Sequence, residues 1–120
     1  MSMSGSELTV EVRVDGEPRS LPPTVDVSAY RIVQEALTNT LKHADASRAD
    51  VHLRYWPDEL ELEIIDDGRG DGAASTSSGG LGLIGMRERA ALHGGQLTAG
   101  PAASGGFAVR VWLPTLTGAL

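Results

Sequence analysis

The sequence predicts an α+β fold, a two-layer α/β sandwich in which helices cover one face of a mixed, mostly antiparallel sheet. Several short segments alternate between apolar and polar residues, as half-buried strands do. Two longer segments repeat their apolar residues with the period of a helix. Neighbouring strands are separated mainly by short turns, which favours antiparallel pairing.

The length and composition limit the possible functions. The 120 residues fit one domain, expected over residues 7–115 between short tails at 1–6 and 116–120, and the absence of cysteine excludes disulfides. The net charge of −6 argues against a nucleic-acid partner, since general nucleic-acid binders are normally basic. With no long apolar run and no secretory signal, we expect no membrane contact by this domain.

The first expected elements are a strand and a long helix. Leu8 to Val14 alternates strictly, as a half-buried strand does, and Asp15-Gly16 then predicts a hairpin with a short return strand. From about Val25 to Ala44 the period becomes helical, and an apolar stripe would face the core. The stripe consists of Ile32, Val33, Ala36, Leu37, Thr40 and Leu41.

Two strands are expected next, at residues 49–55 and 59–64. The second has glutamates at alternate positions, which we interpret as a solvated sheet face. They are Glu59, Glu61 and Glu63. After a loop at 66–80 rich in Gly, Ser, Ala and Asp, a helix over 81–93 and strands at 96–99 and 107–113 complete the predicted order.

One face of the long helix is polar and bears the first candidate site. Glu35, Asn39 and His43 are spaced four residues apart, and Lys42 lies beside them. A carboxylate, an amide oxygen and a cation on one face suit Mg²⁺ bound to phosphates, since Mg²⁺ prefers hard oxygen ligands. An ordinary solvated helix face is the alternative interpretation.

Two glycine-containing segments are further candidates. Asp66-Asp67-Gly68-Arg69-Gly70 ends an apolar strand, where a rigidly held carboxylate can accept a hydrogen bond from an amine such as adenine N6, although a simple turn is the alternative. Residues 80–85 match G-x-G-x-x-G, but no strand precedes them directly and no acid follows about 20 residues later, which excludes a dinucleotide-binding loop. A glycine loop that leads into a helix N-terminus remains, and it offers N–H groups to phosphate.

Together these motifs resemble the ATP-binding catalytic domain of sensor histidine kinases, in the gyrase, Hsp90, histidine kinase and MutL superfamily. The resemblance covers about residues 8–114 and implies a Bergerat-type fold. The stretches 30–39 and 82–89 resemble the subgroup that partners NarL-type response regulators. Three boxes carry the resemblance: Glu35-x-x-x-Asn39 with Lys42-His43 (N box), Asp66-x-Gly68-x-Gly70 (G1 box) and Gly80-Leu81-Gly82-Leu83 (G2 box).

The resemblance implies a role for each N-box residue. Asn39 would coordinate Mg²⁺ that bridges the phosphates of ATP. Glu35 would orient Mg²⁺-bound water or act as a base. Lys42 and His43 would meet the phosphates.

The glycine boxes would bind the base and the phosphates. Asp66 would accept a hydrogen bond from the adenine amine, and Gly68 and Gly70 would line the base pocket. The mobile lid over the phosphates would consist of Gly80, Leu81, Gly82 and Leu83. The family often has Gly-Thr before the last strand, but Gly106-Phe107 stands here, so a hydroxyl near the adenine is missing from that position.

The implied function is that of a protein histidine kinase catalytic domain, which positions Mg·ATP for transfer to a histidine. That histidine would belong to the dimerisation and phosphoacceptor domain of the same kinase, because none of the histidines here is followed by the acid that usually flanks an acceptor. A NarL-type response regulator would act downstream. The location would be cytoplasmic, and a membrane tether through a sensor region stays open. The alternatives are an anti-sigma-type serine kinase of the same superfamily and a nucleotide-binding module without catalysis.

Overall fold

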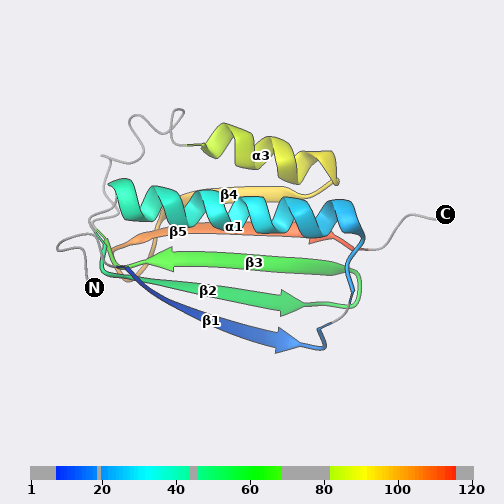
Figure 1. Ribbon diagram of the computed structural model, residues 1–120, viewed down its shortest axis with the longest axis horizontal. Coiled ribbons are helices and arrows are strands. Elements are labelled where there is room, and N and C mark those ends of the chain that lie inside the picture. Colours follow the sequence, from blue (N-terminus) through cyan, green and yellow to red (C-terminus); the bar gives the residue numbers. More distant parts are fainter. Residues whose placement is uncertain (1–7, 19, 44–45, 69–81, 116–120) are drawn as a thin grey trace.

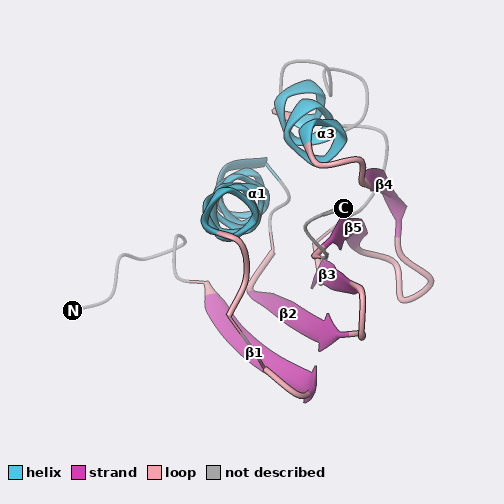
Figure 2. Ribbon diagram, turned by 90° about the vertical axis from the view of Figure 1, so that its right-hand side faces the viewer, coloured by secondary structure: helices cyan, strands magenta, loops and turns pink. Residues whose placement is uncertain are grey.

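The computed structural model describes residues 8–18, 20–43, 46–68 and 82–115, which form two layers (Figure 1). Two helices lie on one face of a single five-stranded sheet, and Figure 2 shows both helices on the same side. This confirms the predicted two-layer α/β sandwich. The elements are β1 (Thr9–Gly16), α1 (Pro23–His43), β2 (Arg48–Tyr55), β3 (Glu59–Asp66), α3 (Leu83–Leu92), β4 (Gln96–Pro101) and β5 (Phe107–Pro114).

The strand order is β1-β2-β3-β5-β4. β1 and β2 are parallel and the other neighbours are antiparallel, so the sheet is mixed and mostly antiparallel, as predicted. The predicted hairpin after β1 is wrong. Gly16 does turn the chain, with φ +87°, but no described residue between β1 and α1 forms a return strand. Instead, α1 is the crossover that parallel strands require, and it brings β2 beside β1.

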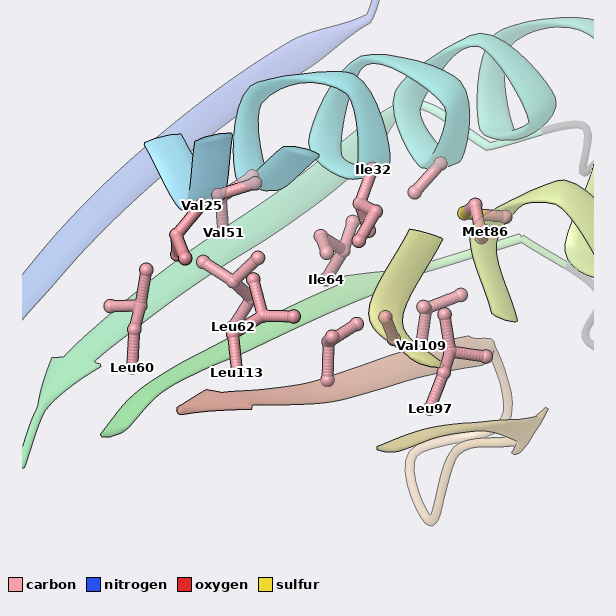
Figure 3. Close-up of a cluster of buried hydrophobic side chains, with 14 of the residues drawn as sticks. Val25, Ile32, Val51, Leu60, Leu62, Ile64, Met86, Leu97, Val109 and Leu113 are labelled. Carbon is pink, nitrogen blue, oxygen red and sulfur yellow. The ribbon is translucent and has the colours of Figure 1, made fainter. Parts of the chain in front are cut away.

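The hydrophobic core lies between the sheet and the two helices (Figure 3). The predicted apolar stripe of α1 faces it, with Ile32 fully buried and Ala36 nearly so, whereas Leu41 at the end of the stripe is 49% exposed. Met86 and Ala90 bring α3 onto the same core. Among the described residues, neither helix is long and apolar enough to cross a membrane.

The edge strand β1 is exposed along its whole length, so the prediction of a half-buried strand is wrong. Its alternation is real, because Val10, Val12 and Val14 pair with Ala49, Val51 and Leu53 on the helix side of the sheet. The cause is the placement of α1, which packs over β2, β3 and β5 and leaves β1 beyond its reach (Figure 2).

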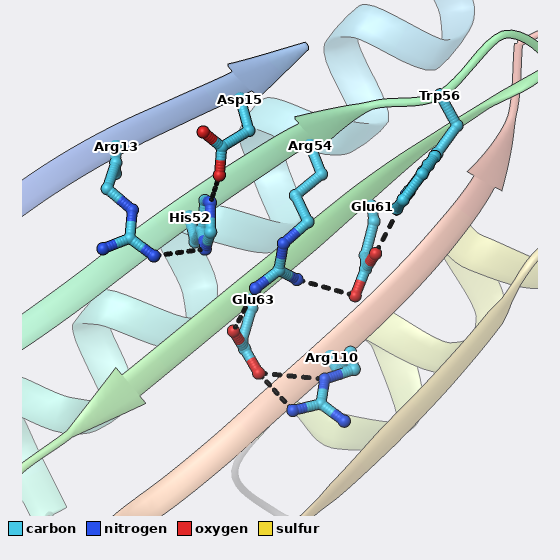
Figure 4. Close-up of polar contacts among 8 residues, drawn as sticks. All are labelled: Arg13, Asp15, His52, Arg54, Trp56, Glu61, Glu63 and Arg110. Carbon is cyan, nitrogen blue, oxygen red and sulfur yellow. Dashed lines mark hydrogen bonds and ion pairs between the residues drawn. The ribbon is translucent and has the colours of Figure 1, made fainter.

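The glutamates of β3 are not the solvated face that was predicted. Glu61 and Glu63 are only 9% and 8% exposed, because arginine side chains from neighbouring strands and the Trp56 side chain, directly after β2, cover them (Figure 4). Glu61 accepts hydrogen bonds from Arg54 at 2.9 Å and from the indole N–H of Trp56 at 3.0 Å. The face opposite the helices is therefore a network of ion pairs.

Glu63 is held between two arginines of this network. Arg110 donates from Nε at 3.0 Å and also from Nη2, and Arg54 donates at 3.4 Å. Burial raises the pKa of Glu63, but the hydrogen bonds and charges of the two arginines outweigh it and hold the pKa below its usual value.

His52 joins β1 to the same network. It is 7% exposed, its Nδ1 accepts a hydrogen bond from Arg13 at 3.3 Å, and its Nε2 donates to Asp15. The hydrogen bond from His52 lowers the pKa of Asp15.

Candidate functional site

The polar flank of α1 faces α3. A cavity of about 190 Å³ lies between the two helices, and its lining includes Glu35 from α1 and Gly82 at the start of α3. Two cationic side chains, Arg31 and Arg89, line it as well. Asn39 is half-buried one turn beyond Glu35 on the same flank. The N-box carboxylate, the second glycine of the G2 box and two arginines therefore share one cavity.

Gly82 touches Glu35 directly. A Cβ built on Gly82 would lie 2.8 Å from both Cγ and Cδ of Glu35, closer than carbon atoms can approach. Gly82 has φ +81° and occupies the N-cap position of α3, where no side chain caps the helix. The first N–H groups of α3 therefore have no side-chain cap at the end of the helix that lies beside Glu35.

Asp66 ends β3 and its carboxylate points into the fold. The residue is 5% exposed. Oδ1 accepts hydrogen bonds from the backbone N–H of Gly68 at 2.8 Å and of Phe107 at 3.2 Å. Oδ2 accepts one from the hydroxyl of Thr40 at 3.2 Å. The carboxylate is thus fixed from three directions, by β5, by α1 and by its own turn.

Gly106 makes this arrangement possible from the side of β5. A Cβ on Gly106 would lie 2.7 Å from the carbonyl carbon of Asp66 and 3.2 Å from its Oδ1. A side chain at Gly106 would push β5 away, so the hydrogen bond from Phe107 to Asp66 needs a glycine before it.

The neighbouring Asp67 faces the other way and holds the loop before β2. Its Oδ1 accepts hydrogen bonds from the backbone N–H of Ser47 and of Arg48, both at 2.9 Å, and its Oδ2 accepts one from the Ser47 hydroxyl at 2.9 Å. The N–H of Arg48 and the hydroxyl of Ser47 lower the pKa of Asp67 below its usual value. Asp67 therefore fixes the turn that carries Asp66.

The remaining predicted site residues are distributed as follows. Lys42 is exposed on the last turn of α1, and His43 is the last residue of that helix. Leu83 is the first residue of α3, and its side chain is buried in the core. Three predicted residues lie outside the described part of the chain: Gly70, Gly80 and Leu81.

Thr40 contributes to the site although it was not among the predicted site residues. It belongs to the predicted apolar stripe of α1 and is only 4% exposed. Its hydroxyl nevertheless joins α1 to Asp66. The available signal was a hydroxyl inside an otherwise apolar stripe, directly after Asn39.

A second missed contact joins the two helices at their other ends. The Ser28 hydroxyl on α1 and Nε2 of His93, the C-cap residue of α3, are 2.8 Å apart. Together with the contact between Glu35 and Gly82, this hydrogen bond fixes α3 alongside α1.

Residues 24–117 match the family described as histidine kinase-, DNA gyrase B- and HSP90-like ATPase. Two similar curated proteins come from Bacillus subtilis. The sensor histidine kinase YxjM is 42% identical over 98 residues, which cover 82% of this chain and 23% of that protein. The sensor histidine kinase LnrJ is 37% identical over 103 residues, which cover 86% of this chain and 25% of that protein. The chain thus spans about a quarter of the length of these relatives.

Solved structures show the same fold. The histidine kinase domain of the blue-light activated histidine kinase from Erythrobacter litoralis EL346 is 26% identical with a TM-score of 0.67, over 89% of this chain and 52% of that one. The ATP-binding domain of PrrB from Mycobacterium tuberculosis is 23% identical with a TM-score of 0.69, over 92% and 82%. With a family match over most of its length, the chain belongs to the histidine kinase-, DNA gyrase B- and HSP90-like ATPase family.

Proposed function

We propose that this chain is the ATP-binding catalytic domain of a sensor histidine kinase. It binds ATP with Mg²⁺ and presents the γ-phosphoryl group to a histidine of a separate dimerisation and phosphoacceptor domain. The buried, triply hydrogen-bonded carboxylate of Asp66 carries the proposal. The names of the relatives, sensor histidine kinases, support it.

Asp66 would recognise the base. An ionised carboxylate has about four lone-pair positions, and the described residues fill three of them. The position left on Oδ2 can accept one more hydrogen bond, which suits the exocyclic amine of adenine. Guanine has a carbonyl oxygen at that place and would leave two acceptors facing each other. Gly68 and Gly70 would let the backbone approach the base closely.

The phosphates would bind where α1 meets the N-terminus of α3. The uncapped N–H groups after Gly82 and the positive end of the helix dipole suit an anion. Lys42, His43, Arg31 and Arg89 would add positive charge. Within the proposed lid, the backbone would make these contacts at Gly80, Leu81, Gly82 and Leu83.

Glu35 and Asn39 have the hard oxygen donors that a Mg²⁺–phosphate site needs, one turn apart on the same flank of α1. Asn39 would hold the ion through its amide oxygen, and Glu35 would hold water bound to it or act as a base. Mg²⁺, when bound, would neutralise charge on the phosphates. In the part of the chain that the structure describes, no three His, Asp or Glu side chains are placed so that they could hold a metal ion together, so the phosphates themselves would supply the remaining ligands.

The phosphoryl acceptor would come from another domain. His52 is enclosed by Arg13 and Asp15, and His93 is hydrogen-bonded to Ser28, so neither is free to attack a phosphate. A kinase of this kind would work in the cytoplasm and pass its phosphoryl group to a NarL-type response regulator, as the stretches 30–39 and 82–89 suggest.

Calorimetric titration with ATP and GTP, with Mg²⁺ and with EDTA, tests the nucleotide site. The unchanged protein should prefer ATP, and Asp66→Ala should lose about 1–3 kcal/mol of ATP binding because the base amine is left unpaired. Asp58→Ala removes a carboxylate directly before β3, at the end of the strand opposite to Asp66, and should leave nucleotide binding unchanged. Equal affinity for ATP and GTP in the unchanged protein would contradict the assignment.

A transfer assay then tests the acceptor. The protein with labelled ATP should phosphorylate a histidine-bearing helical hairpin and not a serine-bearing antagonist protein. Transfer to serine would favour the anti-sigma-type alternative, and normal ATP binding without any transfer would favour a binding module.

A further inference from the structure

Thr40 occupies an unusual position for a hydroxyl. It lies in the core-facing stripe of α1 and is 4% exposed. Its Oγ1 is 3.0 Å from the carbonyl oxygen of Ala36, one turn earlier, and 3.2 Å from Oδ2 of Asp66. The side chain therefore lies between its own helix and the proposed base-binding carboxylate.

The hydroxyl has one proton and two possible acceptors. A carboxylate is the stronger acceptor, because a hydrogen bond to an ionised group is roughly twice as strong as one between neutral groups. Donation to Asp66 also satisfies an oxygen that receives no other hydrogen bond from the described residues, whereas Oδ1 already receives two from the backbone. The proton should therefore point mainly at Asp66.

This contact decides which way the carboxylate faces. The backbone N–H groups of Gly68 and Phe107 hold Oδ1, so they fix one end of the group. Thr40 is the only described residue that holds Oδ2, the oxygen left to meet a ligand. Without the hydroxyl, the carboxylate could rotate about its Cβ–Cγ bond, and its free lone pair would no longer have a fixed direction.

We infer that Thr40 is a positioning residue for base specificity, which acts by hydrogen-bonding Asp66 so that its free lone pair points at an exocyclic amine. The inference rests on the proposed function. It also explains how the site can lack a hydroxyl at position 107, where the family often has threonine. Phe107 contributes only a backbone N–H to Asp66. The hydroxyl beside the carboxylate comes from the helix instead of from the start of β5.

The test compares Thr40→Val, which has the same shape without the hydroxyl, with Thr40→Ser, which keeps the hydroxyl. Each variant is titrated with ATP, GTP and inorganic tripolyphosphate, and its melting temperature is measured. Thr40→Val should bind ATP about tenfold more weakly, the loss of one hydrogen bond to a charged group, with GTP and tripolyphosphate unchanged. Thr40→Ser should restore ATP binding. Thr24→Val, on the same helix about 24 Å away, is the matched control and should behave as the unchanged protein.

The outcomes separate this inference from the proposed function. If Asp66→Ala loses the preference for ATP and Thr40→Val keeps it, the inference about Thr40 is wrong and the nucleotide site stands. If Thr40→Ser loses as much as Thr40→Val, packing of the methyl group is responsible and the inference is equally overturned. If the unchanged protein does not distinguish ATP from GTP, both proposals fail. Should Thr40→Val not fold, the smaller Thr40→Ala carries the same test.

Discussion

Gly82 packs its α-carbon against the side chain of Glu35, so the start of α3 and the polar flank of α1 are in contact with no room for a methyl group between them. The contact joins two residues that are 47 positions apart in the sequence. Gly82 also has φ +81°, so the backbone requires glycine at this position, and any larger side chain would in addition displace the Glu35 side chain.

Gly82→Ala should therefore disturb the site and the fold together. A left-handed conformation costs a non-glycine residue about 1–2 kcal/mol, and the new methyl group must push Glu35 away. We expect a lower urea midpoint and weaker ATP binding. Combining it with Glu35→Ala should relieve the clash but not the backbone strain, so part of the stability should return.

Gly85→Ala is the matched control on the same helix. Gly85 lies inside α3, and no atom of its surroundings lies within 4 Å of a Cβ built there. Replacing a helical glycine with alanine should raise stability by up to about 1 kcal/mol. A loss of stability in Gly85→Ala equal to that in Gly82→Ala would show that neither position behaves as described.

Gly106→Ala should be strongly destabilising because its methyl group would meet backbone and not a flexible side chain. The carbonyl carbon of Asp66 would be 2.7 Å away, so β5 must separate from β3. Overpacking of this kind costs about 1–3 kcal/mol and sometimes more. Gly100→Ala on β4, where a Cβ meets nothing within 4 Å, is the control. Urea unfolding compares the two, and equal midpoints would contradict the close approach.

Arg110→Ala should destabilise the protein at neutral pH and much less in acid. Glu63 would keep only the 3.4 Å contact with Arg54, so its buried charge would be poorly compensated. We expect a loss of about 1–2 kcal/mol at pH 7, below the value for a fully buried pair because Arg110 is 44% exposed.

The pH dependence of this loss has a definite sign. The folded protein has a lowered Glu63 pKa, so the ionised glutamate stabilises the fold above about pH 4.3, the usual glutamate value, and this contribution disappears as the pH falls through the lower folded value. The gap in urea midpoint between the unchanged protein and Arg110→Ala should therefore narrow in acid. The exposed Arg87 of α3 is the control, and its replacement by alanine should give no such gap at either pH.

The parts of the fold that were predictable are those with local causes. The helical period of α1 and the alternation of β2, β3 and β5 depend only on residues close together in the sequence. The predicted bounds of these elements therefore agree with the observed bounds to within about two residues. The prediction of a hairpin was wrong because Asp15-Gly16 indicates only a turn. The same turn occurs whether the chain returns beside β1 or crosses through α1 to β2. The predicted exposure of Glu61 and Glu63 was wrong because their burial depends on the residues that lie opposite them, Arg54 and Arg110. The alternation within one strand does not determine that register.

The parts of the candidate site that could be predicted are those whose arrangement is determined within a single helix or strand. Glu35 and Asn39 share a flank because they are four residues apart on a helix, and Asp66 ends a strand. Thr40 was missed because its role depends on a partner 26 residues later, on an element that α1 packs against. A threonine in an apolar stripe is ordinarily a core residue, and only the position of Asp66 distinguishes this one.

Asp67 should stabilise the turn that carries Asp66, and replacing it should affect stability more than nucleotide recognition. Asp67→Ala removes acceptors for the N–H groups of Ser47 and Arg48 and for the Ser47 hydroxyl, so the melting temperature should fall at pH 7. The folded pKa of Asp67 is lowered, so its ionised form stabilises the fold above about pH 4, and this contribution is lost as the pH falls further. The difference in melting temperature between the two proteins should therefore shrink below pH 4.

The conservative variant Asp67→Asn keeps an acceptor oxygen, so its melting temperature should fall less than that of Asp67→Ala. Both variants should still prefer ATP to GTP, because the carboxylate that meets the base is that of Asp66. If Asp67→Asn lost this preference while its melting temperature stayed unchanged, the base would be recognised by Asp67 and the assignment to Asp66 would be wrong.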